Sequence, residues 1–449
     1  MTDDQGWGDV GFNGHPRLRT PHLDRLAREG VRLDRFYAAA PVCSPTRASS
    51  LTGRHPSRYH IDWAYGGPLP VEEATLATLL REGGYRTAFF GKWHLGQLSR
   101  TLPQGRRHTP HPDRYAPPWE RGFEVVFATE GSVPTYNPYY YIDPRGPAQP
   151  ILEQAAETLG TAHRWPQNYW TGPGRFVDEA LTGDDSALIM DQALDFMLKG
   201  QDTPFFACIW FHTPHTPIVA GADWRALYPG STLAEQHWWG ALSAMDAQIG
   251  RLREKLESWG MADDTIIVFC SDNGPSYVHP LGSAGPFRGR KGSLEEGGIR
   301  VPALVYWPAG PPGGRVVSDP LSTSDLLPTM LRWADVATPL GAHWDGEDLT
   351  GLLTGEVSSR DRPIFFHSPL RNPDDPWPRA EGFQAAVQWR DFKLLTLDSG
   401  ATWALYNLVT DPGEQVDLSA EAIDVVAALR AQFESWRESC LESRAHYDR

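Results

Sequence analysis

Residues 41–54 read PVCSPTRASSLTGR, and the rest of the chain is organised around this stretch. Pro45 suits the first turn of a helix, where its missing N–H costs nothing, and Gly53 suits the left-handed residue that ends one. The pattern therefore predicts a short helix with Cys43 at its N-terminus, where free N–H groups and the helix dipole favour an anion. Arg47, one turn later, is predicted to point the same way. For a cysteine in isolation, a buried thiol beside a surface arginine is the simpler interpretation.

The stretch resembles the signature of the formylglycine-dependent sulfatases, which belong to the alkaline phosphatase superfamily. That signature is Cys-x-Pro-x-Arg followed by a short helix ending in Thr-Gly-Arg, and it is matched here by Cys43, Pro45, Arg47 and Thr52-Gly53-Arg54. Further family motifs follow in the family's order over nearly the whole chain. The resemblance implies that a separate maturation enzyme oxidises Cys43 to formylglycine, and that residue 43 is both the nucleophile and a metal ligand.

Length and composition limit the class of protein. A chain of 449 residues exceeds one ordinary core, which predicts two lobes. With 41% hydrophobic and 22% charged residues it reads as globular, and no apolar run approaches the ~20 residues of a membrane helix. A net charge of −15 argues against a nucleic-acid partner. It also means that a site for an anionic substrate must supply its own positive charge.

The four cysteines are scattered and indicate neither a disulfide framework nor a zinc site, because none of them has C-x-x-C spacing. Cys208 and Cys270 lie inside apolar runs and are predicted to be core residues. Cys440 lies near the C-terminus.

Helix, glycine, apolar strand and polar tip alternate along the first 353 residues. This rhythm predicts an α/β fold, with a large mixed, mostly parallel sheet sandwiched by helices and its chemistry at the carboxyl ends of strands. The expected helices cover 20–30, 72–82, 185–199 and 242–256, and the expected strands cover 31–39, 85–90, 204–211, 265–270 and 303–307.

Residues 354–449 have shorter segments separated by turn signals. Strands are expected at 383–387 and 392–397, and a terminal helix at 423–436. The pattern is similar to the small C-terminal subdomain of the sulfatases, which has a short antiparallel sheet and one helix.

Two acidic segments are candidates for a metal site. Asp3-Asp4 alone would be a solvated terminus, and Asp272-Asn273 alone would be a turn. The resemblance implies instead that Asp3, Asp4, Asp272 and Asn273 bind one cation together with residue 43. Hard cations prefer such oxygen ligands, so we expect Ca²⁺, with Mg²⁺ as the alternative.

The start of the chain departs from the family pattern. In the family an apolar strand directly precedes the aspartate pair, and here none does. We expect that the start is placed too far downstream, since losing a central strand would leave two neighbours with unpaired edges. A signal peptide would have been lost with it, and the resemblance implies a periplasmic or secreted protein. Gly6–Gly11 also fits G-x-G-x-x-G, but no strand precedes it, so a dinucleotide site is rejected.

Four further basic residues match family motifs. Lys92 and His94 alternate around Trp93 after a strand and can face one cleft. Taken singly, each would be a solvated side chain. The resemblance implies that Lys92 and Lys291 bind sulfate, that His94 contacts the aldehyde hydrate, and that His215 contacts the bridging ester oxygen.

His212 and His215 have a spacing that invites a zinc interpretation. No helix carries the pair and two prolines interrupt it, so zinc is rejected. His212 is left as a candidate wall of the pocket.

Residues 99–183 form an irregular insertion rich in proline and aromatic residues. A stretch this long is more often functional than idle, and in related enzymes it shapes the substrate pocket. Aromatic packing and stacking on sugar rings explain its composition equally well.

The predicted function is hydrolysis of sulfate monoesters, with a carbohydrate sulfate preferred over a small aryl sulfate. The alternatives are a phosphonate monoester or phosphodiester hydrolase of the same fold, and a non-catalytic sugar-binding protein. The expected partners are a sulfated small molecule or saccharide and the maturation enzyme, with no nucleic acid and no membrane. The sequence leaves the oligomeric state open.

Overall fold

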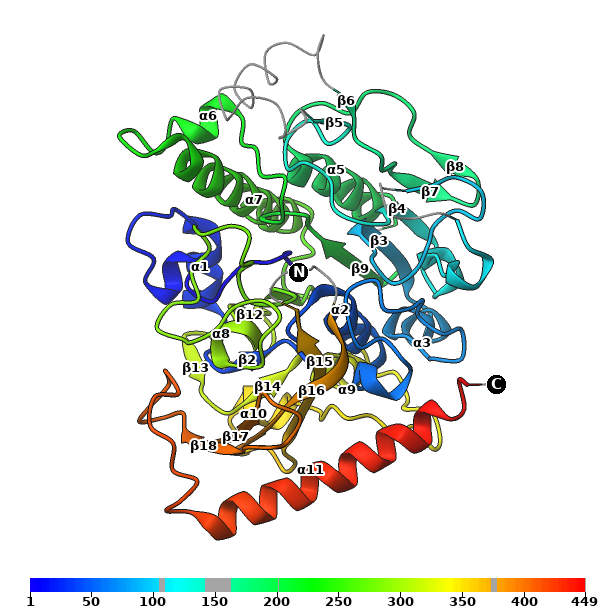
Figure 1. Cartoon of the computed structure of the whole chain (residues 1–449). Coiled ribbons are helices and arrows are strands. Elements are labelled where there is room, and N and C mark those ends of the chain that lie inside the picture. The colour runs from blue at the N-terminus through cyan, green and yellow to red at the C-terminus, as the bar shows by residue number, and fades with distance from the viewer. Residues whose placement is uncertain (105–109, 142–162, 201, 373–377, 449) are drawn as a thin grey trace.

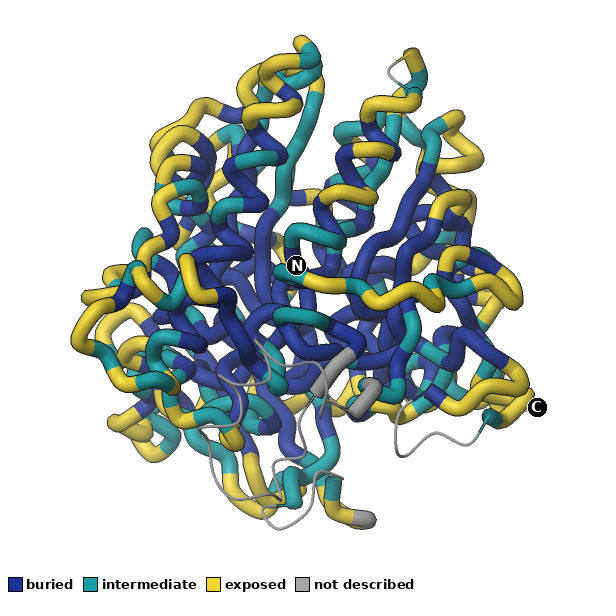
Figure 2. Tube along the Cα trace, turned by 90° about the horizontal axis from the view of Figure 1, so that it is seen from above, coloured by how far each residue is buried: buried dark blue, intermediate teal, exposed yellow. Residues whose placement is uncertain are grey.

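A computed structural model describes residues 1–104, 110–141, 163–200, 202–372 and 378–448. Helices and mixed sheets alternate along the chain, as an α/β fold requires (Figure 1). Buried residues run through the middle of the molecule and exposed ones lie at its periphery (Figure 2). The N-terminal residue lies in this interior in both views.

A five-stranded sheet with the order β8-β7-β4-β3-β9 carries part of the site. Its centre is β3 (Arg86–Lys92), which pairs in parallel with β4 (Val125–Thr129) on one side and with β9 (Phe205–Trp210) on the other. The edge strands β7 (Trp170–Gly172) and β8 (Arg175–Phe176) are antiparallel. The sequence did not predict β4, because its five residues lie within the proline- and aromatic-rich insertion.

A second sheet has the order β10-β12-β1-β13, with β10 (Ile267–Cys270), β12 (Ala303–Tyr306), β1 (Val31–Leu33) and β13 (Arg315–Val317). Three short strands form a third sheet, with β2 (Phe36–Tyr37) between β11 (Arg300–Val301) and β14 (Leu321–Ser322). The predicted strand 31–39 is therefore wrong as a single element. The chain changes sheets at Asp34 and Arg35, whose backbone groups bond to Val317 and Leu321.

Among the residues that the structure describes, five main helices cover the sheets of the large lobe: α1 (Pro21–Glu29), α2 (Cys43–Thr52), α3 (Leu76–Glu82), α5 (Asp185–Leu198) and α7 (Leu233–Ser258). Two begin elsewhere than predicted because of capping. Thr75 accepts a hydrogen bond from the Thr78 N–H, so α3 starts at Leu76 and not at 72. Thr232 and Glu235 form a capping box, which starts α7 nine residues before the predicted 242.

Short elements complete the large lobe: η1 (Gly11–Asn13), η2 (Pro56–Arg58), η3 (Pro112–Arg114), η4 (Pro118–Glu120), β5 (Tyr140–Tyr141), β6 (His163–Arg164), α6 (Ala222–Arg225), α8 (Glu296–Ile299), η6 (Thr323–Asp325), α9 (Leu326–Trp333) and α10 (Thr350–Thr354).

The C-terminal part has a four-stranded antiparallel sheet of β15 (Ile364–Arg371), β16 (Pro378–Trp389), β17 (Phe392–Thr396) and β18 (Ala404–Asn407). One long helix, α11 (Ile423–Arg444), packs on it through Leu429 and Phe433. A buried ion cluster ties this sheet to the large lobe, since the Lys393 Nζ lies 2.9 Å from both Glu296 and Glu414. The expected antiparallel sheet with one helix is confirmed, and the domain boundary at 353 stays a prediction.

The two large sheets face each other across an apolar cavity of about 820 Å³. Its walls include β9 and β10, which are the edge strands of their sheets. Met1 and Thr2 enter one end: the Met1 amino group donates to the Ile209 carbonyl at 2.9 Å, and the Thr2 N–H donates to the Cys270 carbonyl at 2.9 Å. No strand among the described residues fills the remainder. The cavity therefore has the backbone edges for one more parallel strand.

We expect an apolar six-residue extension fused ahead of Met1 to fill this cavity and pair with both edges. Each new hydrogen bond contributes about 1 kcal/mol, so the midpoint of thermal unfolding should rise by roughly 5 °C or more. Calorimetry of the extended chain beside the original one measures this. An extension of equal length with alternating prolines is the control, because proline cannot donate to the ladder. An equal shift in both extended chains, or none in either, would refute the interpretation.

Candidate active site

Helix α2 presents Cys43 at its first turn, as the sequence predicted. Val42 precedes it in extended conformation, and Gly53 ends it in the left-handed conformation with φ 66°. All ten residues of α2 are buried, and the Cys43 side chain is 1% exposed. The residue predicted as nucleophile therefore lies inside the molecule, at a helix end whose free N–H groups suit an anion.

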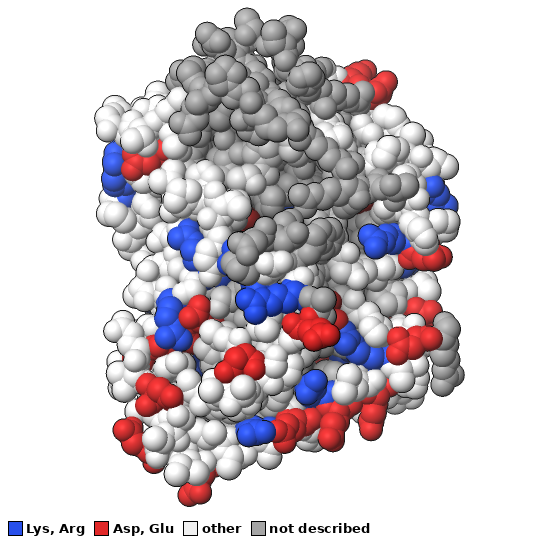
Figure 3. All heavy atoms as spheres, viewed as in Figure 1, with Lys and Arg blue, Asp and Glu red and all other residues white. Residues whose placement is uncertain are grey.

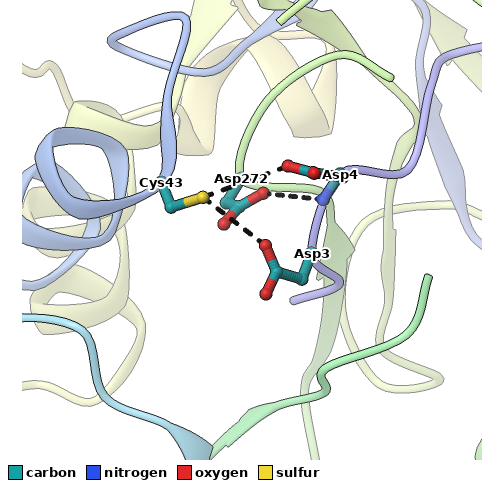
Figure 4. Close-up of side chains that lie close together, drawn as sticks. All are labelled: Asp3, Asp4, Cys43 and Asp272. Atoms are coloured by element: carbon teal, nitrogen blue, oxygen red, sulfur yellow. Dashed lines mark hydrogen bonds between the residues drawn. The ribbon is translucent and has the colours of Figure 1, made fainter. Parts of the chain in front are cut away.

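Four potential metal ligands, Cys43 and three carboxylates, converge at one place (Figure 4). One ligand atom each from Asp3, Asp4, Cys43 and Asp272 lies within 4.8 Å of the others, and all four residues are buried. Asp3 and Asp4 follow the Met1–Thr2 segment, and Asp272 follows β10. Asp4 has φ 64°, a conformation that a non-glycine residue keeps only where its surroundings enforce it. The structure thus brings together acidic residues 268 and 269 positions apart in sequence.

Asn273 completes the predicted ligand set. Its amide nitrogen donates to the Asp4 carboxylate at 2.8 Å, and its Oδ1 is buried with no hydrogen-bond partner. An unpartnered buried oxygen is costly unless a cation binds it. Burial and the neighbouring Asp3 raise the pKa of Asp272 to about 6, against the influence of Arg47. The oxygen-rich donor set and this crowding of carboxylates fit a hard divalent cation.

Three cationic side chains surround these carboxylates. The Arg47 guanidinium donates to Asp272 Oδ2 at 2.7 and 3.0 Å and lies 5.1 Å from the centre of the Trp210 ring. The Lys92 Nζ donates to Asp3 Oδ2 at 2.6 Å. Lys291 pairs with Asp4, and its Nζ lies 3.3 Å from the Cys43 sulfur. Positive charge is therefore concentrated at residue 43.

Two histidines complete the group. His94 has φ 57°, and both of its ring nitrogens are buried without a hydrogen-bond partner. Burial, reinforced by Lys92 and Arg47, holds the pKa of His94 well below its ordinary value, so the ring is neutral. His215 Nε2 lies 3.8 Å from Asp4, and its Nδ1 lies 2.7 Å from the Thr216 carbonyl. Burial also lowers the pKa of His215.

Burial and the neighbouring carboxylates determine whether Cys43, Lys92 and Lys291 are ionised. Burial, and next Asp272, raise the pKa of the Cys43 thiol far above its ordinary value. Burial alone would lower the pKa of Lys291, but Asp4 holds it well above its ordinary value. Asp3 does the same for Lys92 to a smaller degree. At neutral pH the site therefore combines an un-ionised thiol with two charged ammonium groups.

Sequence reasoning missed three residues at the site. The Ser132 hydroxyl donates to Asp3 at 3.3 Å, the Ser44 hydroxyl donates to the His94 carbonyl at 2.7 Å, and the Tyr65 ring packs edge-on against His94 with centroids 4.0 Å apart. Ser132 and Tyr65 lie in irregular segments without a motif, so no pattern pointed to them. Ser44 is next to Cys43 and could have been found by adjacency.

The interpretation of His212 as a pocket wall is wrong. Its side chain is 0% exposed and bonds to Asp185 and Thr129, because the chain directly after β9 is still buried.

Acidic and basic side chains are interspersed on the face seen in Figure 3, among the residues drawn there in colour. The chain as a whole carries −15. The local positive charge that an anionic substrate needs is thus supplied inside the molecule by Arg47, Lys92 and Lys291.

Comparison with known proteins identifies the family. The sulfatase family profile matches residues 1–336. The chain belongs to the sulfatase family. Mouse steryl-sulfatase is 32% identical over 82% of this chain, and dog N-acetylgalactosamine-6-sulfatase is 32% identical over 82%. The chain spans 66% and 67% of the lengths of these two relatives. Membership places it among the sulfuric ester hydrolases.

Solved structures of other proteins have the same fold as this chain. Ps i-CgsB in complex with k-i-k-neocarrahexaose superposes with a TM-score of 0.81 and 28% identity, covering 98% of this chain and 92% of that one. The phosphonate monoester hydrolase SpPMH from Silicibacter pomeroyi shares the fold, with a TM-score of 0.67 and 21% identity over 98% of this chain and 94% of that one. Within the described residues, no helix has the length and apolarity needed to span a membrane.

We expect Ca²⁺ to stabilise the sulfatase-family site and to do so through Asp272. A ligand that binds only the folded state at 100 times its dissociation constant adds about 2.7 kcal/mol. The increase in the thermal midpoint on adding Ca²⁺ should therefore be clear in the original chain and lost in Asp272→Asn.

The matched control for this measurement is Asp246→Asn, which removes another buried carboxylate that accepts from the backbone N–H groups of His22 and Leu23. This variant should lower the starting midpoint and keep the full Ca²⁺ response. A Ca²⁺ response that survives in Asp272→Asn would place the cation elsewhere.

Proposed function

We propose that this chain hydrolyses sulfate monoesters, with a sulfated saccharide as substrate, at residue 43. The observation that supports this most is the convergence of Arg47, Lys92 and Lys291 on Cys43 in an acidic chain. A sulfate ester is a compact anion, and charge develops on its oxygens as the ester bond breaks. Fixed cations in a buried site stabilise such charge without reorganising.

Cys43 as encoded is a poor nucleophile, because its thiol stays protonated and a thiol–sulfate adduct has no easy exit. We propose that it is converted to formylglycine, whose hydrate supplies one hydroxyl for attack on sulfur and a second for release of sulfate. We propose that Asp3, Asp4 and Lys291, which contact the Cys43 sulfur, hold that group together with His94. Asp3, Asp4, Asp272 and Asn273 would hold a divalent cation, proposed to be Ca²⁺, which adds Lewis-acid stabilisation of charge.

The two histidines have different proton roles. Neutral His94, with two unpartnered nitrogens, is suited to accept a proton from residue 43. The His215 Nδ1–H is committed to the Thr216 carbonyl, which can only accept, so His215 can donate from Nε2 only as the imidazolium. Lys291 remains charged at neutral pH. We therefore assign protonation of the leaving oxygen to Lys291, with His215 contacting the same oxygen.

The proposal that the substrate is a saccharide is based on what related proteins bind or are named for. Ps i-CgsB was solved with k-i-k-neocarrahexaose, and the dog relative is named for N-acetylgalactosamine 6-sulfate. Tyr65 beside His94 is 37% exposed, in agreement with an aromatic surface for a sugar ring at the entrance. A maturation enzyme that acts on Cys43 is part of the proposal, as is export from the cytoplasm.

Co-expression with a formylglycine-generating enzyme tests the proposal. Mass spectrometry should find an aldehyde in the peptide spanning Cys43, and the product should release sulfate from 4-nitrophenyl sulfate and from a sulfated galactoside. Cys43→Ala should lose both activities with its thermal midpoint unchanged. An aldehyde-bearing protein that cleaves a phenyl phosphonate ester and neither sulfate ester would instead be a phosphonate hydrolase.

Lys291→Ala should distinguish leaving groups. Loss of a general acid costs roughly 10²- to 10⁴-fold where the leaving oxygen needs a proton. We expect a loss in this range with the sulfated galactoside, and a much smaller one with 4-nitrophenyl sulfate, because nitrophenolate departs without a proton. Steady-state kcat/KM for both esters measures this. Equal losses would mean that Lys291 only binds sulfate and that the acid is another group.

A further inference from the structure

A buried histidine–carboxylate pair lies behind the catalytic site and has no part in the chemistry described above. His212 Nδ1 lies 2.8 Å from Asp185 Oδ2, and both side chains are 0% exposed. His212 follows β9, and Asp185 is the first residue of α5. Tyr169 donates its hydroxyl to the other oxygen of Asp185. Burying a charged pair this completely is costly unless every polar atom is bonded, and here each is.

The partners fix the protons on the His212 ring. Its Nε2 lies 2.7 Å from the Thr129 hydroxyl, and that hydroxyl lies 2.7 Å from the Gly131 carbonyl. A carbonyl can only accept, so the single hydroxyl proton of Thr129 goes to Gly131. His212 must then donate from Nε2, and it also donates from Nδ1 where Asp185 is a carboxylate that accepts from both His212 and Tyr169. In that arrangement both ring nitrogens carry protons, and the pair is an imidazolium with a carboxylate.

The pair connects two strand ends that carry catalytic residues. Thr129 ends β4, and its carbonyl accepts from the Trp93 N–H at 2.9 Å, between Lys92 and His94. On the other side, the His212 carbonyl accepts from the His215 N–H at 2.7 Å. The next carbonyl, that of Thr213, accepts from the Asp3 N–H at 3.1 Å.

We propose that the Asp185–His212–Thr129 chain is a positioning unit that sets the distance between the Lys92–His94 tip and the His215 loop. The inference rests on the proposed function, since the groups it positions are the proposed sulfate-binding and proton-transfer residues. The pair acts through the backbone of the two tips and does not touch substrate. Its contribution is realised in the transition state, where sulfate and leaving oxygen must be held at once.

Two substitutions break the hydrogen-bonded Asp185–His212–Thr129 chain at different points. His212→Gln removes the ion pair, and Thr129→Val removes only the hydroxyl in a side chain of the same shape. We expect each to lower kcat for the sulfated galactoside by roughly 10- to 100-fold while KM changes little. Thr129→Ser keeps the hydroxyl and should restore kcat close to that of the original chain.

Ser186→Ala is the matched structural control. It removes a buried hydroxyl that lies 3.2 Å from the Thr213 hydroxyl, at the same junction of α5 and β9. It should cost a similar loss in thermal midpoint and leave kcat close to that of the original chain. Equal kcat in Thr129→Val and Thr129→Ser would overturn the proposal, as would a loss confined to KM or shared by Ser186→Ala.

A measurement independent of activity separates this inference from the proposed function. In protein with ¹⁵N-labelled histidine, two ring N–H signals should be present that disappear in His212→Gln. A single ring N–H for His212 would overturn the assignment of protons. If both signals are present but the original chain hydrolyses no sulfate ester, the proposed function is wrong. The assignment of an imidazolium–carboxylate pair at His212 and Asp185 is then still supported.

Discussion

The structure depends on one electrostatic constraint, the burial of three carboxylates beside residue 43. Asp3, Asp4 and Asp272 are each almost completely removed from water, and an unpaired buried carboxylate would be neutralised rather than tolerated. Lys92, Lys291 and Arg47 pair with them one to one. Three negative and three positive side chains leave no net charge to hold an anionic substrate. A bound divalent cation would leave a positive surplus for an anionic substrate, so the proposed metal ligands and the proposed sulfate-binding cations depend on one another.

This constraint explains why the site is assembled from strand ends. The carboxyl ends of β3, β9 and β10 meet at one place, so short polar tips reach a common point while the strands behind them stay apolar. Gly91 in β3 shows how close the packing is, since its φ of 102° and the nearby Trp210 carbonyl leave no room for a side chain. The strained conformations at Asp4 and His94 are sustained by the same surroundings.

The sequence was sufficient wherever a motif coincided with an element boundary. The helix between Cys43 and Gly53, the tip carrying Lys92 and His94, and the Asp272–Asn273 turn were all predicted, because each couples a glycine or proline signal to a family pattern. The sequence could not predict which acidic side chain pairs with which basic one. That Lys291 would meet Asp4 rather than Asp272 is decided by tertiary packing between residues 287 positions apart. β4 and Ser132 were missed because their insertion has no periodicity.

His212 shows a different limit. Its spacing from His215 first indicated a pair of ligands, yet the two side chains have opposite surroundings. Two residues separate them, and the turn at Thr213 and Pro214 directs one into the packed interior and the other toward Asp4. Only the partner atoms, Asp185 for one and Asp4 for the other, distinguish the proposed positioning residue from the proposed catalytic one.

The burial of Cys43 also limits the stage of folding at which its proposed modification can occur. Cys43 is 1% exposed, every residue of α2 is buried, and the sulfur lies 3.5 Å from Asp3 and 3.3 Å from Lys291. No enzyme can reach a side chain enclosed in this way without displacing the carboxylate cluster. The proposed conversion of Cys43 would therefore have to precede the packing of α2, while the stretch 41–54 is still an extended peptide. Under that proposal the stretch would first be a linear peptide that a maturation enzyme can bind. In the folded chain it is a helix whose N-terminus, with Arg47 one turn later, lies at the charged site.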